Sequence, residues 1–341
     1  MSQTDPESTQ TTDAPSPDAP SPDPWPFASE RDNTRREHNN DDDYEYDPRW
    51  DPKAPGYVKS GDKRTVLITG CSDGGLGSAL AQAFWHRNYY VFATARETGK
   101  MQAVGSWADV CMLTLDVTKP GDIQDAVRVL GDRGLDVLIN NAGQAHFGPV
   151  LDEDLDHVRR TFEVNYLGPL AVTQAFAPAL IKARGVAVYI TSLAGHLNIP
   201  WMSTYAGLKS ATEIMAETLR QEMRPFGVDV MEIVTGAVRS NGQAGFDDYA
   251  LPAGSLYKPI EPAIRNFVQG GDGIPRMDTM EYANAVADEI ISRRTQGRFW
   301  YGTNAELVKG TTVPAGWDQA AMDAGAVMGS GLNSLGKDPE P

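Results

Sequence analysis

From about residue 62 onward, short apolar runs rich in β-branched residues alternate with longer segments of mixed polarity. The first run, TVLIT at residues 65–69, ends at a glycine, as a buried parallel strand does. The following segment, LGSALAQAFWHRN, places Leu76, Leu80, Ala83 and Phe84 at helical spacing. The patterned region therefore begins with a strand, a glycine-rich loop and an amphipathic helix.

The same alternation continues downstream. The pattern predicts further strands at YYVFATAR, CMLTLDV, LDVLINNAG, VAVYITS and VDVMEIVTGAV, separated by helical segments. Alternating strands and helices predict a parallel sheet with helices on both faces, and a first strand that feeds a glycine loop predicts a nucleotide site at the carboxyl edge. We therefore expect one α/β domain over residues 62–309, with a Rossmann-type doubly wound parallel sheet.

Three regions depart from this pattern. Residues 1–61 are acidic and rich in Pro, Ser and Thr, with too little apolar surface to offset chain entropy, so we expect a disordered tail. Because this tail contains aromatic residues, the alternative that it folds onto the body or onto a partner stays open. Residues 240–280 are irregular and follow a predicted strand end, which favours a lid over a substrate pocket. Residues 310–341 are glycine-rich, and we expect them to be loosely ordered.

Charge and cysteine content narrow the function classes. Residues 1–62 carry −9 of the net charge of −16, and an acidic chain is a poor candidate for binding a phosphate backbone, so no nucleic-acid partner is expected. Cys71 and Cys111 neither form a disulfide framework nor show metal-ligand spacing, so no metal is expected. The N-terminus does not resemble a targeting segment, and no apolar run approaches the roughly 18 to 20 residues of a membrane span. We expect a cytoplasmic protein with no transmembrane segment.

The loop after the first strand reads TGCSDGGLG, residues 69–77. The dinucleotide fingerprint G-x-G-x-x-G would require glycine at position 72, where this chain has Ser72. The backbone N–H groups of such a loop, together with the N-terminus of the following helix, can still face a pyrophosphate. Asp73 would repel phosphates unless its side chain turns outward.

Four further motifs follow in order: N-N-A-G at residues 140–143, Asn165 in a predicted helix, Ser192 at a strand end, and Tyr205 four residues before Lys209. With the glycine loop, they resemble the short-chain dehydrogenase/reductase family over about 245 of the 341 residues. Each motif alone is weak, whereas five in order and at the family's spacing are specific.

The chemistry of Tyr205 agrees with this resemblance. Tyr205 and Lys209 lie on one helical face. A tyrosine with a pKa near 10 suits neutral acid–base work poorly, and a nearby ammonium lowers that pKa at about 1.4 kcal/mol per unit. The resemblance implies that Tyr205 is the general acid/base, that Lys209 lowers its pKa and holds the ribose, that Ser192 polarises the carbonyl, and that Asn165 joins a proton relay.

The end of the second predicted strand bears on the cofactor. Where the family has an Asp that selects NAD, this chain has Ala95-Arg96. An arginine can pair with the 2′-phosphate of NADP, so we expect NADP(H) to be preferred over NAD(H). The neighbouring acidic residue Glu97 is an argument for NAD(H) instead. The resemblance implies that the following residues contact the cofactor: Gly70, Ser72, Gly75, Leu76, Gly77, Arg96, Asp116, Val117, Asn141, Ala142, Gly143, Tyr205, Lys209, Gly236, Val238 and Ser240.

The chain departs from the family pattern in two places. Its glycine loop is one residue longer than T-G-x-x-x-G-x-G, and the most economical alignment treats Asp73-Gly74 as the expansion. In TGAVRS, Thr235 replaces the usual Pro and Ser240 the usual Thr. For Asp116, a turn or helix N-cap role stays open beside adenine contact.

The stretches VLITGCSDGGLGSALA and ATARETGKM resemble the fungal branch around NADPH-dependent 1-acyldihydroxyacetone-phosphate reductase. Members of that branch generally carry an apolar C-terminal segment, and here the corresponding residues are polar and glycine-rich. We therefore expect reduction of a ketone, or oxidation of the alcohol, of another apolar small molecule in specialised metabolism, with the acylated lipid precursor as the alternative. A non-catalytic nucleotide-binding scaffold and another reaction on the same fold stay open. The resemblance also implies a dimer or tetramer.

Overall fold

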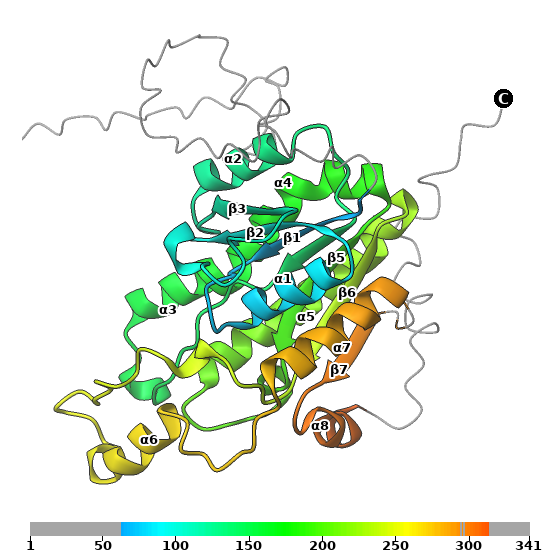
Figure 1. Ribbon diagram of the computed structural model, residues 1–341. Coiled ribbons are helices and arrows are strands. Elements are labelled where there is room, and N and C mark those ends of the chain that lie inside the picture. Colours follow the sequence, from blue (N-terminus) through cyan, green and yellow to red (C-terminus); the bar gives the residue numbers. More distant parts are fainter. Residues whose placement is uncertain (1–62, 294, 296, 314–341) are drawn as a thin grey trace, which may run out of the picture. The chain divides into compact units, whose positions relative to one another are not determined.

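Seven parallel strands form one sheet, in the order β3-β2-β1-β4-β5-β6-β7 (Figure 1). The computed structural model describes residues 63–293, 295 and 297–313, so the predicted N-terminal tail and most of the predicted C-terminal tail lie outside the described residues. The strands are β1 (Thr65–Thr69), β2 (Tyr90–Ala95), β3 (Val110–Thr114), β4 (Val137–Asn140), β5 (Val186–Ser192), β6 (Asp229–Thr235) and β7 (Gly297–Tyr301). The predicted Rossmann-type sheet is confirmed.

Helices cover both faces of this sheet. α1 and α7 pack together on one face, and α2, α4 and α5 cover the other (Figure 1). The α-helices are α1 (Leu76–His86), α2 (Pro120–Leu130), α3 (Leu155–Phe162), α4 (Gly168–Ala183), α5 (Ser203–Met223), α6 (Glu261–Val268), α7 (Thr279–Ser292) and α8 (Ala305–Thr312). The shorter helices are η3 (Thr98–Lys100), η4 (Val150–Asp152), the π-helical turn η5 (Glu163–Leu167), η6 (Leu193–His196), η7 (Arg224–Phe226), η8 (Asn241–Gln243) and η9 (Lys258–Ile260).

The central strands are buried on both faces. All residues of β1, β2 and β4 are buried, as near-continuous apolar runs in a parallel sheet should be. The main core joins alternate strand residues such as Val188 and Ile233 to α1 and α7. This packing fixes the carboxyl ends of the strands, and therefore the loops that follow them, along one edge.

The segment Leu155–Ala183 combines α3, η5 and α4 into one long helical path. Among the described residues it is the one helix with the length and apolar composition of a membrane span. Its α4 part packs against α2, β4 and β5, as the core helix of an α/β sheet does. The π-helical turn in its middle contains the buried Asn165.

The irregular segment 240–280 has a small core of its own. Leu251, Ile264 and Val268 are buried there. Phe147 and Trp201, which belong to loops after β4 and β5, pack against them. Beyond this segment, α7, β7 and α8 extend the fold, and α8 ends at Thr312, slightly past the predicted boundary at 309.

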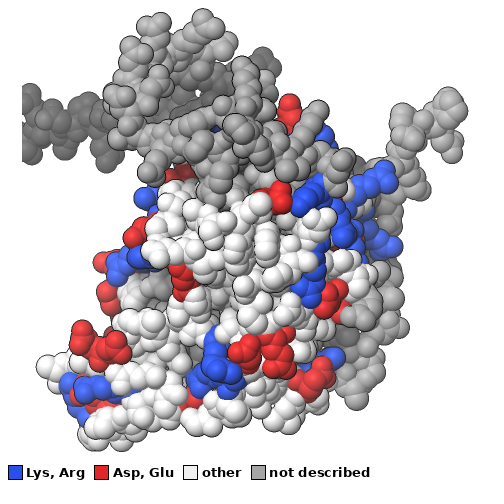
Figure 2. Space-filling model, in the orientation of Figure 1, with Lys and Arg blue, Asp and Glu red and all other residues white. Residues whose placement is uncertain are grey.

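One face of the molecule shows how charge is distributed. In Figure 2, acidic and basic side chains border a broad uncharged area, and basic side chains gather along its right-hand side. Strong binding to a phosphate backbone needs clustered Lys and Arg. The expectation of no nucleic-acid partner rests on the acidic sequence and stays a prediction.

Candidate active site

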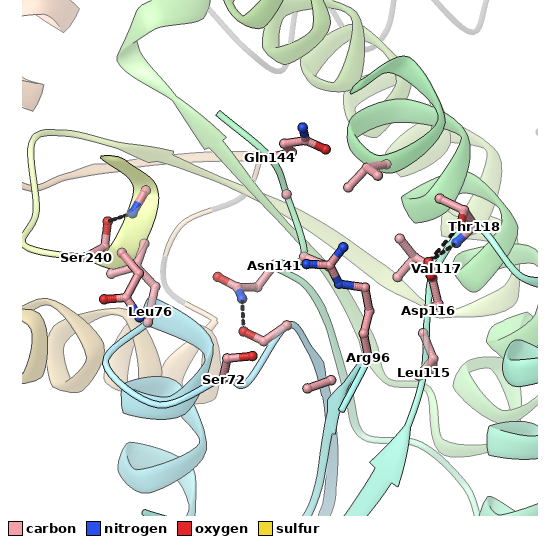
Figure 3. Close-up of a pocket in the computed structure, with 18 of the residues that line it drawn as sticks. Ser72, Leu76, Arg96, Leu115, Asp116, Val117, Thr118, Asn141, Gln144 and Ser240 are labelled. Carbon is pink, nitrogen blue, oxygen red and sulfur yellow. Dashed lines mark hydrogen bonds between the residues drawn. The ribbon is translucent and has the colours of Figure 1, made fainter. Parts of the chain in front are cut away.

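A cavity of about 830 Å³ lies at the carboxyl ends of β1 to β4 (Figure 3). Most of the predicted cofactor residues line it: Gly70, Ser72, Gly75, Leu76, Arg96, Asp116, Val117, Asn141, Ala142, Gly143 and Ser240. Sequence reasoning missed other lining residues, which are Ala95, Leu115, Thr118, Gln144, Arg160, Glu163, Val164, Asn241 and Gly242. Several adjoin a predicted residue, whereas those from α3 and η5 carry no motif that would have marked them.

Two glycines allow the loop and the start of α1 to approach closely. Gly70 has a φ of +77°, a conformation that favours glycine. A Cβ on Gly77 would lie 2.3 Å from the Gly70 carbonyl oxygen, so no side chain fits there. Gly77 therefore lies beneath the loop rather than along the cavity.

The side chain of Asp73 turns away from the cavity. Its carboxylate accepts hydrogen bonds from the backbone N–H groups of Gln102 and Ala103, at 2.9 and 3.0 Å. Its own N–H donates to the Lys100 carbonyl at 2.7 Å, and its carbonyl accepts from Asn241 Nδ2 at 2.7 Å. The outward orientation removes the expected conflict with phosphates, and the extra loop residue links three segments.

The N-N-A-G motif joins the ends of β1 and β4. Asn141 Nδ2 donates to the carbonyls of Thr69 and Gly70, at 2.8 and 3.1 Å. Thr69 Oγ1 accepts from the N–H groups of Asn141 and Ala142, both at 3.0 Å. These bonds fix the wall of the cavity next to the glycine loop.

Arg96 extends from the end of β2 between Asn141 and the segment that contains Asp116 (Figure 3). Glu97 instead bonds Lys100 Nζ at 2.6 Å, and this contact lowers the pKa of Glu97. Asp116 lines the cavity and also accepts bonds from Thr118 N and Oγ1, at 3.0 and 2.8 Å. Although partial burial raises the pKa of Asp116, the Thr118 hydrogen bonds outweigh it and the pKa is lowered. Asp116 thus has a turn role toward Thr118, and its contact with adenine stays a prediction.

The four predicted catalytic residues come from β5, η5 and α5. A hydrogen bond links the hydroxyls of Ser192 and Tyr205. Lys209 is buried, with Nζ donating to the Ile190 carbonyl at 2.8 Å and lying 5.6 Å from the centre of the Tyr205 ring. Asn165 exchanges two hydrogen bonds with the backbone of Gln144, at 2.7 and 2.8 Å.

The pKa of Tyr205 differs in direction from the sequence expectation. Burial raises it, and the hydrogen bond from Ser192 opposes that rise. Burial also lowers the pKa of Lys209 to about 8, an effect that the Glu232 carboxylate opposes. Desolvation thus works against the charged form of each group.

The end of β6 and the segment after it lie close to the cavity. Ser240 lines it. Val238 is buried and forms a bridge with Met277. A Cβ on Gly236 would lie 2.4 Å from the Thr303 carbonyl oxygen, so Gly236 allows close packing against the turn after β7. Thr235 Oγ1 bonds the Tyr282 hydroxyl at 2.6 Å.

Two histidines near the site are largely buried beside carboxylates. His146 contacts Glu153, and His196 Nε2 lies 3.0 Å from Glu213. The His196 ring also packs 4.6 Å from that of Trp300. These contacts support packing roles rather than substrate contact.

Comparison with known proteins agrees with this geometry. The family described as short chain dehydrogenase matches residues 64–248. A short-chain dehydrogenase, ptmH, of Penicillium ochrochloron is 43% identical over 236 residues, which cover 68% of this chain and 86% of that protein. An NADPH-dependent 1-acyldihydroxyacetone phosphate reductase of Schizosaccharomyces pombe is 32% identical over 274 residues, 78% of this chain and 90% of that protein.

Solved structures share the fold. A short-chain dehydrogenase from Streptomyces avermitilis superposes with a TM-score of 0.63 at 27% identity, covering 81% of this chain and 99% of that one. Another, from Burkholderia cenocepacia in complex with NADP, gives 0.60 at 25% identity, with 77% and 96% covered. The chain therefore belongs to the short-chain dehydrogenase/reductase family, oxidoreductases that use nicotinamide cofactors to interconvert CH–OH and C=O groups.

Proposed function

We propose that the protein is an NADP(H)-dependent enzyme that reduces a ketone, or oxidises the alcohol, of an apolar small molecule. The observation that carries the proposal is the convergence of Tyr205, Ser192 and Lys209, which hydrogen bonds and burial hold beside the nucleotide cavity. A chain kept only as a nucleotide-binding scaffold would not need this arrangement.

The residues that line the cavity suit NADP(H). Glycines at 70 and 77 let backbone N–H groups at the start of α1 approach a pyrophosphate. Arg96 lines the cavity, whereas the competing carboxylate of Glu97 is engaged by Lys100, which supports NADP(H) over NAD(H). Lys209 would hold the nicotinamide ribose. When bound, the cofactor supplies or accepts the hydride.

The protein's own groups manage the substrate oxygen. Ser192 donates a hydrogen bond to it and fixes its position. Tyr205 delivers the proton during reduction and removes it during oxidation. Lys209 stabilises the tyrosinate electrostatically and so opposes the effect of burial. Asn165, next to Gln144, would hold a water that returns protons from solvent.

The segment 240–280 supports an apolar substrate. Phe246, Tyr249 and Phe267 pack against its small core, and the rings of Phe246 and Phe267 contact Phe147 from the loop after β4. An apolar ketone beneath this lid would be shielded from water. The acylated lipid precursor is the alternative, because a relative at 32% identity is named for that activity.

We further propose a homo-oligomer, as the resemblance implied, and a cytoplasmic location. Cys71 and Cys111 are buried and form no disulfide, which is compatible with a reducing compartment.

A Tyr205→Phe variant tests the assignment. NADPH oxidation is followed against acyl-dihydroxyacetone phosphate and a panel of aromatic and polyketide ketones. Loss of the general acid should lower kcat by roughly 100- to 10,000-fold on any ketone turned over, with NADPH binding retained.

The matched control is Tyr89→Phe. Tyr89 is buried directly before β2, at the opposite end of the strand from the carboxyl edge, so this variant should leave kcat unchanged. Unchanged turnover in Tyr205→Phe would refute the acid assignment. Turnover of the lipid alone would favour the alternative substrate.

A further inference from the structure

A cluster of buried charged side chains lies behind Lys209, between α5 and the sheet. Arg298 on β7 contacts Glu213 on α5 through Nη2 at 2.7 Å. Its Nε lies 3.1 Å from Glu232 on β6. Glu213 also faces His196, as described above. None of these groups has a part in the chemistry proposed so far.

Glu232 is the most deeply buried member, at 1% exposure. Thr191 Oγ1 donates to its Oε1 at 2.5 Å, and Arg298 pairs with it in register on the neighbouring strand. Arg298 Nε and Glu232 Oε2 are within ion-pair distance but are not aligned for a hydrogen bond. The cost of burying a carboxylate can exceed the gain from its partners, so a glutamate in the middle of a buried strand is unusual.

A metal site is one interpretation of this cluster. His196, Glu213 and Glu232 present ligand atoms within 4.8 Å of one another. However, the Arg298 guanidinium contacts both carboxylates. The chain itself therefore supplies the cation that these two acids need, and the cluster is better understood as a charge network.

That network reaches the catalytic lysine. Lys209 lies one helical turn before Glu213 on α5, and its Nζ bonds the carbonyl of Ile190, the residue before Thr191. Burial lowers the pKa of Lys209 to about 8, and the Glu232 carboxylate is the group that opposes this. Because this value already includes the effect of Glu232, the pKa of Lys209 would be lower still without that charge.

We propose that Glu232 is a positioning residue that keeps Lys209 in its ammonium form as the solution becomes alkaline. Burial and the neighbouring Glu213 raise the pKa of Glu232 to about 8, against the lowering effects of Thr191 and Arg298. Glu232 therefore ionises at a higher pH than an ordinary glutamate and gains its charge in the range where Lys209 would otherwise deprotonate. The charged and titratable groups that face Glu232 are Lys209, Glu213 and Glu217 from α5, Arg298 from β7, and, through Glu213, His196 from η6.

The experiment measures the protonation of Lys209 directly, because the role of Lys209 in turnover rests on the proposed function. The full chain is labelled with [6-13C]lysine, and the Lys209 signal, assigned by its loss in Lys209→Arg, is followed from about pH 6 to pH 11. In Glu232→Gln the midpoint should fall by about one pH unit, the usual effect of removing a nearby opposite charge. Where a ketone substrate is known, the alkaline limb of kcat should move equally, with kcat at pH 6 to 6.5 within about twofold of wild type.

The control is Glu289→Gln, a buried glutamate on α7, on the other face of the sheet, which should leave the Lys209 midpoint in place. Thr191→Val removes the hydrogen bond to Glu232 and a longer one to the Ile233 carbonyl, while the Glu232 carboxyl stays in place. It should give a smaller shift in the same direction, and it replaces Glu232→Gln if that variant does not fold. An unchanged Lys209 midpoint in Glu232→Gln would overturn the proposal, and the same holds for Thr191→Val where that variant replaces it. A loss of kcat that is equal at all pH values would also overturn it. A shifted midpoint without turnover of any ketone would uphold it and refute the proposed function instead.

Discussion

At the scale of single residues, replacing Arg96 by glutamine tests the cofactor preference. Arg96 lines the cavity, and Glu97 beside it is engaged by Lys100. Hydrogen bonds to a charged group contribute roughly 1.5 to 3 kcal/mol, so kcat/KM for NADPH should fall by about 10- to 100-fold. The kcat/KM for NADH should stay within about threefold of the wild-type value. Steady-state kinetics with both cofactors measure the ratio.

Arg128→Gln is the control for this prediction, because Arg128 is exposed on α2 and pairs with Asp125. Arg128→Gln should change kcat/KM for neither NADPH nor NADH. An equal loss with both cofactors in Arg96→Gln would mean that Arg96 does not recognise the 2′-phosphate.

The sequence identified some site residues far better than others. Ser192 and Arg96 directly end or follow predicted strands, and the carboxyl ends of parallel strands share one edge, so their order along the chain predicts their convergence. Glu232 lies in the middle of a strand, where the pattern predicts an apolar residue. Its partner Arg298 belongs to β7, a strand that the pattern did not reveal. Only the register of the sheet brings these two together.

At the scale of elements, the longer glycine loop makes a prediction about Asp73. Removing its carboxylate in Asp73→Ala takes away the acceptor for the N–H groups of Gln102 and Ala103. At roughly 0.5 to 1.5 kcal/mol for each such bond, the loop should lose order and NADPH should bind about 3- to 10-fold more weakly. Titration of NADPH fluorescence measures the change.

Asp125→Ala, which removes one exposed acid on α2, should leave NADPH affinity unchanged. Tighter binding in Asp73→Ala would show that repulsion between Asp73 and the phosphates outweighs its structural bonds. The two effects have opposite signs, so this measurement separates them.

Helical periodicity predicted the path from α3 to α4 but not its interruption. The π-helical turn η5 adds one residue to a helical turn, and patterns at a spacing of 3.6 cannot resolve so small a shift. The turn buries Asn165, whose carbonyl accepts a hydrogen bond from Thr212 on α5 at 3.0 Å. The family resemblance marked this residue, whereas its local geometry needed the packed helices.

At the scale of the whole molecule, the sheet brings distant loops to a single edge. The order of strands and helices was enough to predict the sheet and the edge that holds the cavity. The internal packing of 240–280 was not predictable, because its apolar residues follow neither a helical nor a strand period. It depends on contacts with Phe147 and Trp201, which are distant in sequence.

That packing gives the last prediction. The Phe147 ring lies 5.1 Å from Phe246 and 6.2 Å from Phe267, so it joins the loop after β4 to the proposed lid. Phe147→Ala should loosen the lid and lower kcat/KM for an apolar ketone by roughly 10-fold or more, since losing an aromatic pair alone costs about 0.5 to 1.5 kcal/mol beyond the lost burial. NADPH affinity should stay within about twofold, because none of these rings lines the nucleotide cavity. Phe226→Ala, an exposed position after α5 and before β6, should change neither quantity. If Phe147→Ala weakened NADPH binding as much as ketone turnover, 240–280 would be part of the cofactor site rather than a substrate lid.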